Sequence, residues 1–260
     1  MATDTPLLEL RGVNKSFGPV QVLQDVGFAA RAGEVTALVG DNGAGKSTLV
    51  KCISGTYPIE SGEYFFDGQP VSVHSPRDAA ALGIEIVYQD LALCDNLDVV
   101  QNMFLGRERM RGIVVDENSM EQQAAETLAS LSVRTLKSVR QRVSSLSGGQ
   151  RQTVAIAKAV LWNSKVVVLD EPTAALGVAQ TAQVLALVRR LADRGLAVVL
   201  ITHNMLDVLQ VADRVATLYL GRMAAIVNRK DVNQQQLVEL ITTGSTANLE
   251  ALTATDGALA

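Results

Sequence analysis

Short apolar runs alternate with helical repeats along most of the chain. The runs at 35–39, 166–169 and 197–201 are almost wholly apolar, which is typical of strands that are covered on both faces. Helices are predicted at 48–54, 121–131, 150–161, 179–194 and 204–211. This order predicts an α/β fold, with a mostly parallel sheet and flanking crossover helices.

Two other regions differ from this pattern. Rough alternation at 7–13 predicts a half-buried strand, and 63–73 is typical of a hairpin that turns at Asp67 and Gly68. We therefore expect an antiparallel β-subdomain near the amino terminus. The stretch 90–145 is predicted to be a mostly helical subdomain. We expect one domain over 1–245, and a frayed tail at 246–260, which is rich in Thr and Ala.

Composition excludes several classes of protein. Lys and Arg number 23 against 27 for Asp and Glu, a net charge of −4, which argues against a nucleic-acid partner. No segment approaches the roughly 18 apolar residues of a membrane-spanning helix, and the first ten residues do not resemble a secretory signal. Cys52 and Cys94 lack metal-ligand spacing, so a reducing compartment fits. Work at a membrane would therefore need a partner.

A glycine-rich loop between a predicted strand and helix is the first chemical motif. Its sequence satisfies GxxxxGK[ST], in which backbone N–H groups and a helix start attract phosphate. Lys46 would reach the β- and γ-phosphates, and Ser47 would offer a hydroxyl to Mg²⁺. The motif comprises Gly40, Asp41, Asn42, Gly43, Ala44, Gly45, Lys46, Ser47 and Thr48.

Two acids end the predicted strand at 166–169. Asp170 at a strand's carboxyl end could hold Mg²⁺ through water, and Glu171 could polarise an attacking water. Adjacent carboxylates repel each other, so we expect a cation beside them. The phosphate loop and this acid pair together predict a nucleoside triphosphate site.

A second helix start also has the character of an anion site. Ser147 can cap the helix predicted at 150–161, and Gly148 and Gly149 leave backbone N–H groups bare before Gln150. One triphosphate has room for one such helix start on each side. The second start could therefore serve a site on another copy of the chain, which is a dimer hypothesis.

The sequences GDNGAGKST, LSGGQ and VVVLDEP, in that order, resemble the nucleotide-binding subunit of ATP-binding-cassette transporters over nearly the whole chain. The resemblance implies a P-loop NTPase fold and a head-to-tail homodimer that encloses two ATP molecules. Ser147, Gly148, Gly149 and Gln150 would bind ATP in trans.

The resemblance also implies roles for single residues. Phe17 would stack on adenine, and Gln89 would touch the Mg²⁺ or the water and report to a membrane partner. Ser47, Gln89 and Asp170 would hold Mg²⁺, and Glu171, His203 and Gln89 would form the catalytic set. One departure is Gly177, which stands where the family usually has an Asp in a loop that crosses the dimer interface. His74 matches no family motif, and we expect it at the surface.

The segment 96–108, NLDVVQNMFLGRE, is predicted to be helical and resembles its counterpart in monosaccharide importers of the ribose, xylose and fructose type. The resemblance implies an ATPase subunit at the cytoplasmic face of the membrane. Its partners would be permease subunits and, indirectly, a periplasmic or extracellular sugar-binding protein. An importer for another small solute, a soluble ATPase without a transport role and an inactive module are the alternatives. The intact catalytic set argues against inactivity.

Overall fold

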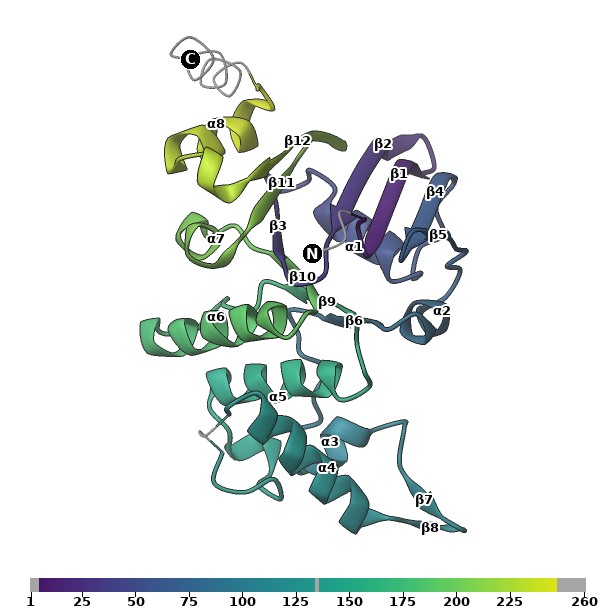
Figure 1. Cartoon of the computed structure of the whole chain (residues 1–260), viewed down its shortest axis with the longest axis vertical. Coiled ribbons are helices and arrows are strands. Elements are labelled where there is room, and N and C mark those ends of the chain that lie inside the picture. Colours follow the sequence, from purple (N-terminus) through teal and green to yellow (C-terminus); the bar gives the residue numbers. More distant parts are fainter. Residues whose placement is uncertain (1–4, 134–135, 247–260) are drawn as a thin grey trace.

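Two sheets form the centre of the computed structural model, which describes residues 5–133 and 136–246 (Figure 1). The larger sheet has the strand order β12-β11-β3-β10-β9-β6. All its neighbouring pairs are parallel except β11 and β12, so the predicted mostly parallel sheet is confirmed. Its strands are β3 (Val35–Val39), β6 (Ile84–Val87), β9 (Val166–Asp170), β10 (Ala197–Ile201), β11 (Arg214–Tyr219) and β12 (Arg222–Asn228).

The smaller sheet is antiparallel, as predicted, with the order β2-β1-β4-β5. Asp67 and Gly68 join β4 to β5 with φ values of +51° and +71°, which a two-residue hairpin turn with positive φ at both positions requires. The strand predicted at 7–13 is longer in the structure. The strands are β1 (Leu8–Phe17), β2 (Val20–Ala30), β4 (Ser61–Phe66) and β5 (Gln69–Pro70).

Helices cover the larger sheet and continue into a separate layer at one end of the molecule (Figure 1). Several begin two or more residues earlier than predicted: α5, for example, begins at Gly148 rather than near Gln150. The helices of the described residues are α1 (Lys46–Ile53), α2 (Pro76–Ala81), α3 (Val99–Phe104), α4 (Glu117–Ser130), α5 (Gly148–Val160), α6 (Val178–Asp193), α7 (Met205–Val211) and α8 (Gln234–Thr243).

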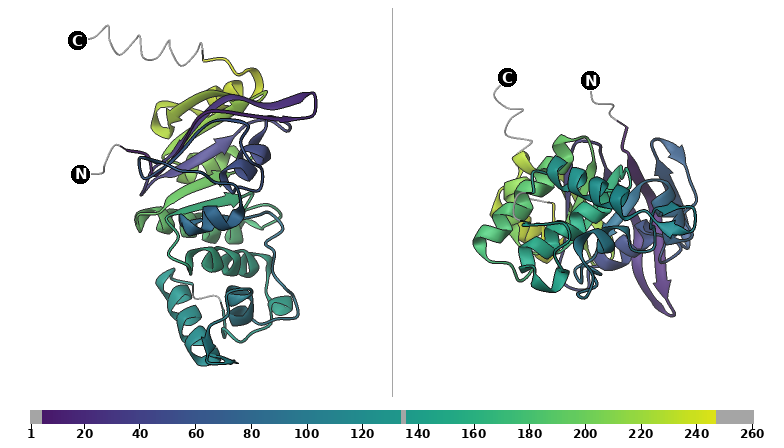
Figure 2. Two further views of the ribbon diagram at one scale, coloured as in Figure 1. Left: turned by 90° about the vertical axis from the view of Figure 1, so that its right-hand side faces the viewer. Right: turned by 90° about the horizontal axis from the view of Figure 1, so that it is seen from below.

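The region 90–145 is less helical than predicted. Its described residues, 90–133 and 136–145, hold α3, α4, a 3₁₀ turn at Val143–Ser145 and an unpredicted hairpin of β7 (Met110–Arg111) and β8 (Val114–Val115). The helix predicted over 96–108 is restricted to α3, because Asp98 caps its start and Gly106 adopts a φ of +80° after its end. Figures 1 and 2 place this region at the opposite end of the molecule from α8.

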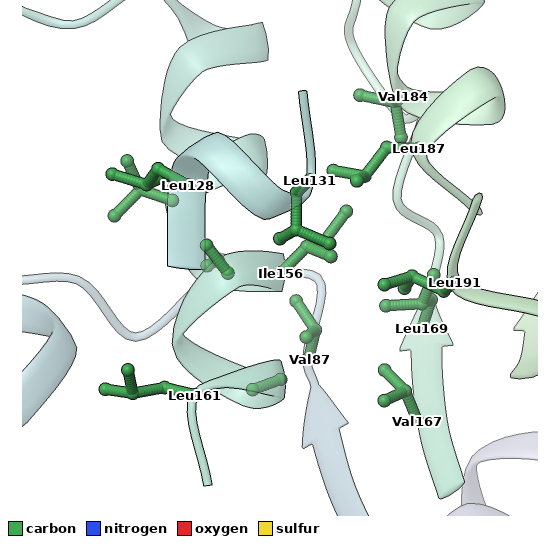
Figure 3. Close-up of a cluster of buried hydrophobic side chains, with 14 of the residues drawn as sticks. Val87, Leu128, Leu131, Ile156, Leu161, Val167, Leu169, Val184, Leu187 and Leu191 are labelled. Carbon is green, nitrogen blue, oxygen red and sulfur yellow. The ribbon is translucent and has the colours of Figure 1, made fainter. Parts of the chain in front are cut away.

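The core is buried on both faces of the larger sheet. Val167 and Leu169 of β9 pack with α5 and α6, whereas Val166 and Val168 face the antiparallel sheet and α1. The first of these clusters extends to α4, because Leu128 of α4 and Leu131 at its C-cap belong to the same cluster as Ile156 of α5 (Figure 3). Continuous apolar strands therefore reflect burial from both sides, as expected. Among the helices of the described residues, none has the length and apolar character needed to cross a bilayer.

Candidate functional site

The glycine-rich loop joins β3 to α1, as predicted. Gly45 precedes α1 with a φ of +105°, and a Cβ on Gly40, whose φ is +154°, would overlap the carbonyl oxygen of Leu218. Both positions therefore require glycine. Lys46 Nζ donates hydrogen bonds to the carbonyl oxygens of Gly40, at 2.7 Å, and Asp41, at 2.9 Å. The loop therefore wraps around the ammonium group of Lys46, the first residue of α1.

The acid pair lies at the carboxyl end of β9, next to the end of β10. Glu171 has a φ of +51°, an uncommon backbone conformation for a residue with a side chain, and its N–H donates to the carbonyl oxygen of Ile201 at 2.9 Å. His203, just beyond β10, places Nδ1 2.9 Å from Oε1 and 2.8 Å from Oε2 of Glu171. The structure therefore brings together two residues that the sequence places 32 positions apart.

Two adjoining hollows connect the loop with these residues. One, of about 450 Å³, is lined by residues that include Asp41, Gln89, Glu171 and His203. The other, of about 340 Å³, has Lys46, Ser47, Thr48, Asp170, Gln89 and Glu171 in its wall. Asn42, Gln89 and Glu171 border both. Most of the predicted phosphate, metal and catalytic residues therefore share one open cleft.

The electrostatics of the cleft favour a bound cation. Burial and the charge of Glu171 raise the pKa of Asp170, although Lys46 opposes this shift. Burial also lowers the pKa of Lys46, whereas Glu171, Asp41 and Asp170 act against that shift. Lys46 is thus the cation expected beside the two acids, and it compensates them only in part. A divalent ion on a phosphate would relieve the remaining repulsion between the carboxylates.

The oxygen atoms of the cleft fit Mg²⁺. Ser47, Gln89 and Asp170 offer a hydroxyl, an amide oxygen and a carboxylate to the same hollow, and Mg²⁺ prefers such hard ligands while keeping several waters. No group of three or more His, Cys, Asp or Glu side chains that could hold a metal occurs within 5–133 and 136–246. A metal here would therefore depend on the hydroxyl and the amide.

Phe17 lies at the end of β1, outside the wall of both hollows. Its side chain is part-exposed, and its ring meets Tyr57 edge to face with centroids 5.1 Å apart. Lys15 Nζ lies 5.5 Å from the centroid of the same ring. An exposed aromatic face of this kind can stack on a base. His74 is exposed, as predicted.

The second helix start is capped as predicted. Ser147 Oγ accepts from the N–H of Gln150, whose side chain accepts from the N–H of Ser147, so a reciprocal capping box opens α5. A Cβ on Gly149 would lie 3.1 Å from Cβ of Gln180, and one on Gly148 would lie 3.2 Å from a methyl of Leu176. These glycines therefore also give room to the loop that follows Glu171 and to the first turn of α6.

Ser147, Gly148, Gly149 and Gln150 do not line either hollow of the cleft. The two predicted anion sites are thus not brought together within the described part of one chain. Gly177 precedes α6, and its N–H donates to the side chain of Gln180 at 3.4 Å. The departure at Gly177 therefore leaves a regular helix start.

Sequence reasoning missed the apolar residues of the cleft, which are Val22, Ile201, Met205 and Ile241. Met205 opens α7, and Ile241 comes from α8, about 200 positions after the glycine-rich loop. The sequence carries no local signal for Ile241, because only the path of β11 and β12 returns the chain to this edge of the sheet. Met205 follows His203 by two positions and could have been inferred from that spacing.

Comparisons with known proteins agree with this geometry. The family model described as "ABC transporter" matches residues 23–174. The chain is 44% identical to the fructose import ATP-binding protein FrcA of Rhizobium meliloti, over 96% of this chain and 98% of the relative. It is also 44% identical to the xylose/arabinose import ATP-binding protein XylG of Sulfolobus acidocaldarius, over 91% and 94%. A solved ATP-binding cassette, dimeric in a post-hydrolysis state with ADP and Pi, is 25% identical with a TM-score of 0.70, over 85% of this chain and 98% of that one.

Proposed function

Because this chain belongs to the ABC transporter family, we propose that it hydrolyses ATP to power import of a monosaccharide of the fructose, ribose or xylose class. The observation that carries the proposal is the shared cleft, where the phosphate loop meets Asp170, Glu171 and His203. The choice of sugar import is supported by the two relatives, which match almost end to end. The proposal treats 1–245 as one ATPase domain, with 90–145 as its subdomain next to the permease. The proposed tail at 246–260 lies, from 247 onward, outside the described residues.

In this proposal, the loop from Gly40 to Thr48 binds the phosphates through its N–H groups, and Lys46 turns from the loop carbonyls to the β- and γ-phosphates. Glu171 accepts the proton of the attacking water, and Nδ1 of His203 fixes the orientation of that carboxylate. Phe17 stacks on the adenine. Ser47, Gln89 and Asp170 would hold Mg²⁺, which would supply positive charge against the phosphates.

A second copy completes the site. The helix start at Ser147–Gln150 lies outside the cleft of its own chain, where the backbone N–H groups of Gly148 and Gly149 would face a phosphate held by a partner. The dimeric state of the solved cassette supports a pair of copies, which we propose to be head-to-tail. Closure of the dimer on ATP would then move the region 90–145 and the permease subunits that it grips. Those contacts would place the chain at the cytoplasmic face of the membrane, and an external sugar-binding protein would deliver the solute.

The test is the Glu171→Gln variant, with Glu63→Gln at an exposed position of β4 as the matched control. The amide retains the size of the carboxylate and an oxygen toward His203 but loses the proton acceptor. We expect turnover of Mg-ATP to fall by about 10²–10⁴, while ATP binding persists and light scattering detects a stable dimer. Hydrolysis at the wild-type rate in E171Q, or a monomer at saturating Mg-ATP, contradicts the proposal.

The imported solute is tested separately in cells. Deleting the reading frame should abolish uptake of labelled fructose, ribose or xylose, and the wild-type gene, but not the E171Q gene, should restore it. Uptake that is unchanged for all three sugars, together with intact ATPase activity, would favour the alternatives: an importer for another solute, or an ATPase without a transport role.

A further inference from the structure

A buried carboxylate outside the cleft has no part in the function described so far. Asp207 on α7 is 4% exposed and lies beside the core residues Val208 and Val211. A carboxylate is rarely buried unless its oxygens are satisfied, because removing it from water is costly. An apolar residue would fill this position at less expense in free energy. The hydrogen bonds of Asp207 therefore need an explanation.

Both oxygens of Asp207 are used, and each bonds a different loop. Oδ2 accepts from the hydroxyl of Thr173 at 2.6 Å, and Oδ1 accepts from the side-chain amide of Asn204 at 3.0 Å. Thr173 follows Glu171 by two positions, and Asn204 directly follows His203. One carboxylate thus bridges the loop that carries Glu171 and the loop that carries His203.

These contacts close a ring. From Glu171 the chain leads to Thr173, then by hydrogen bonds through Asp207 to Asn204, and from His203 back to Glu171 at 2.9 Å. Apart from the bridge and the backbone hydrogen bond from Glu171 to Ile201, the alignment of the two side chains depends on their own contact, to a histidine side chain that is 77% exposed. Glu171 also holds an uncommon backbone conformation that its surroundings must maintain.

We propose that Asp207, acting through Thr173 and Asn204, is a positioning residue that sets the alignment of Glu171 with His203 for hydrolysis. The inference rests on the proposed ATPase function. Asp207 does not line the cleft and does not touch the phosphate loop. It therefore acts on the step that needs Glu171 aligned and leaves nucleotide binding unaffected.

The test removes the hydroxyl of Thr173, which donates its hydrogen bond to Asp207. Thr173→Val retains the shape of the side chain and removes the donor, Thr173→Ser restores a hydroxyl, and Thr127→Val is the control. Thr127 is also half-buried and donates to a backbone carbonyl within α4 at 2.8 Å, far from the cleft in sequence. We expect T173V to lower kcat for ATP hydrolysis about tenfold, which corresponds to a rise of about 1.4 kcal/mol in activation free energy. The KM should stay within about twofold of wild type. T173S and T127V should retain the wild-type kcat.

A second variant keeps the test decisive if T173V does not fold. Asp207→Asn can still accept from Thr173 but cannot accept from Asn204, so we expect a smaller fall in kcat at unchanged KM. Wild-type kcat in a folded T173V or in D207N overturns the inference, as does a rise in KM that accounts for the whole effect. If the wild type hydrolyses ATP and E171Q does not, a normal T173V refutes the positioning role alone. A wild-type chain without ATPase activity refutes both proposals.

Discussion

The Lys46→Met variant distinguishes an effect on nucleotide binding from an effect on stability. The loss of stability can be worked out, because the ammonium group of Lys46 makes two hydrogen bonds of known length. The hydrogen bonds to the carbonyls of Gly40 and Asp41 are lost, at about 1 kcal/mol each. Both residues border an open hollow of about 450 Å³, so water can replace the ammonium. Burial lowers the pKa of Lys46, which means that burying its charge lowers the unfolding free energy. Removing the charge therefore offsets part of the loss of the two hydrogen bonds. The net loss of unfolding free energy should therefore stay below about 2 kcal/mol, or about 8 °C in Tm.

Affinity for nucleotide should fall much further. Charge-assisted bonds to phosphate contribute about 1.5–3 kcal/mol each, so the loss of two corresponds to at least about 3 kcal/mol, or roughly 100-fold in Kd. Calorimetric titration with ATP measures the Kd, and a thermal melt of the same sample measures the Tm. Lys165→Met is the control, because Lys165 immediately precedes β9, at the end away from Asp170, with Nζ 5.6 Å from the centroid of Phe66. A K46M variant that binds ATP within about threefold of wild type would refute the assignment of the cleft to phosphate.

Two further predictions concern the core. Leu191 of α6 is fully buried between the sheet and the helical layer (Figure 3), so Leu191→Ala should lower the unfolding free energy by about 2–5 kcal/mol in urea titrations; a change below about 1 kcal/mol would contradict tight packing there. Burial raises the pKa of the Cys52 thiol to about 11, so about one thousandth is thiolate at pH 8, and native-state alkylation should rise about tenfold per pH unit. Because the folded state keeps a proton that the unfolded state releases, this group should also lower stability as the pH rises from the ordinary thiol pKa to about 11. Alkylation of native Cys52 at pH 8 as fast as in urea would contradict this prediction.

Several buried strands and helices were predictable from the sequence, because each of these has one unambiguous pattern. The strands β3 and β10 match their predicted bounds to the residue, since their apolar runs end abruptly. The short strand β6 was missed, because four residues are too few to distinguish strand from helix. The elements β2, β11, β12, α2 and α8 were not predicted either. The helices α1 and α5 begin earlier than predicted, because the motif residues at their starts were assigned to loops.

The candidate site was predictable where its residues are neighbours in the sequence and form a local motif. The phosphate loop and the acid pair are local motifs, and the structure places both on one cleft. The bridge through Asp207 was not predictable, because an acid in the first turn of a helix usually complements the helix dipole at the surface. Only the tertiary packing of α7 shows that it is buried and bonded to Thr173.

The separation of the two proposed anion-binding helix starts within one chain implies a cellular consequence. Because Ser147–Gln150 does not border the cleft of its own copy, a solitary subunit could hold a nucleotide yet lack half of the enclosure needed to cleave it. Newly synthesised monomers would therefore not consume cellular ATP until they associate with a second copy. ATP hydrolysis would then depend on assembly of the dimer.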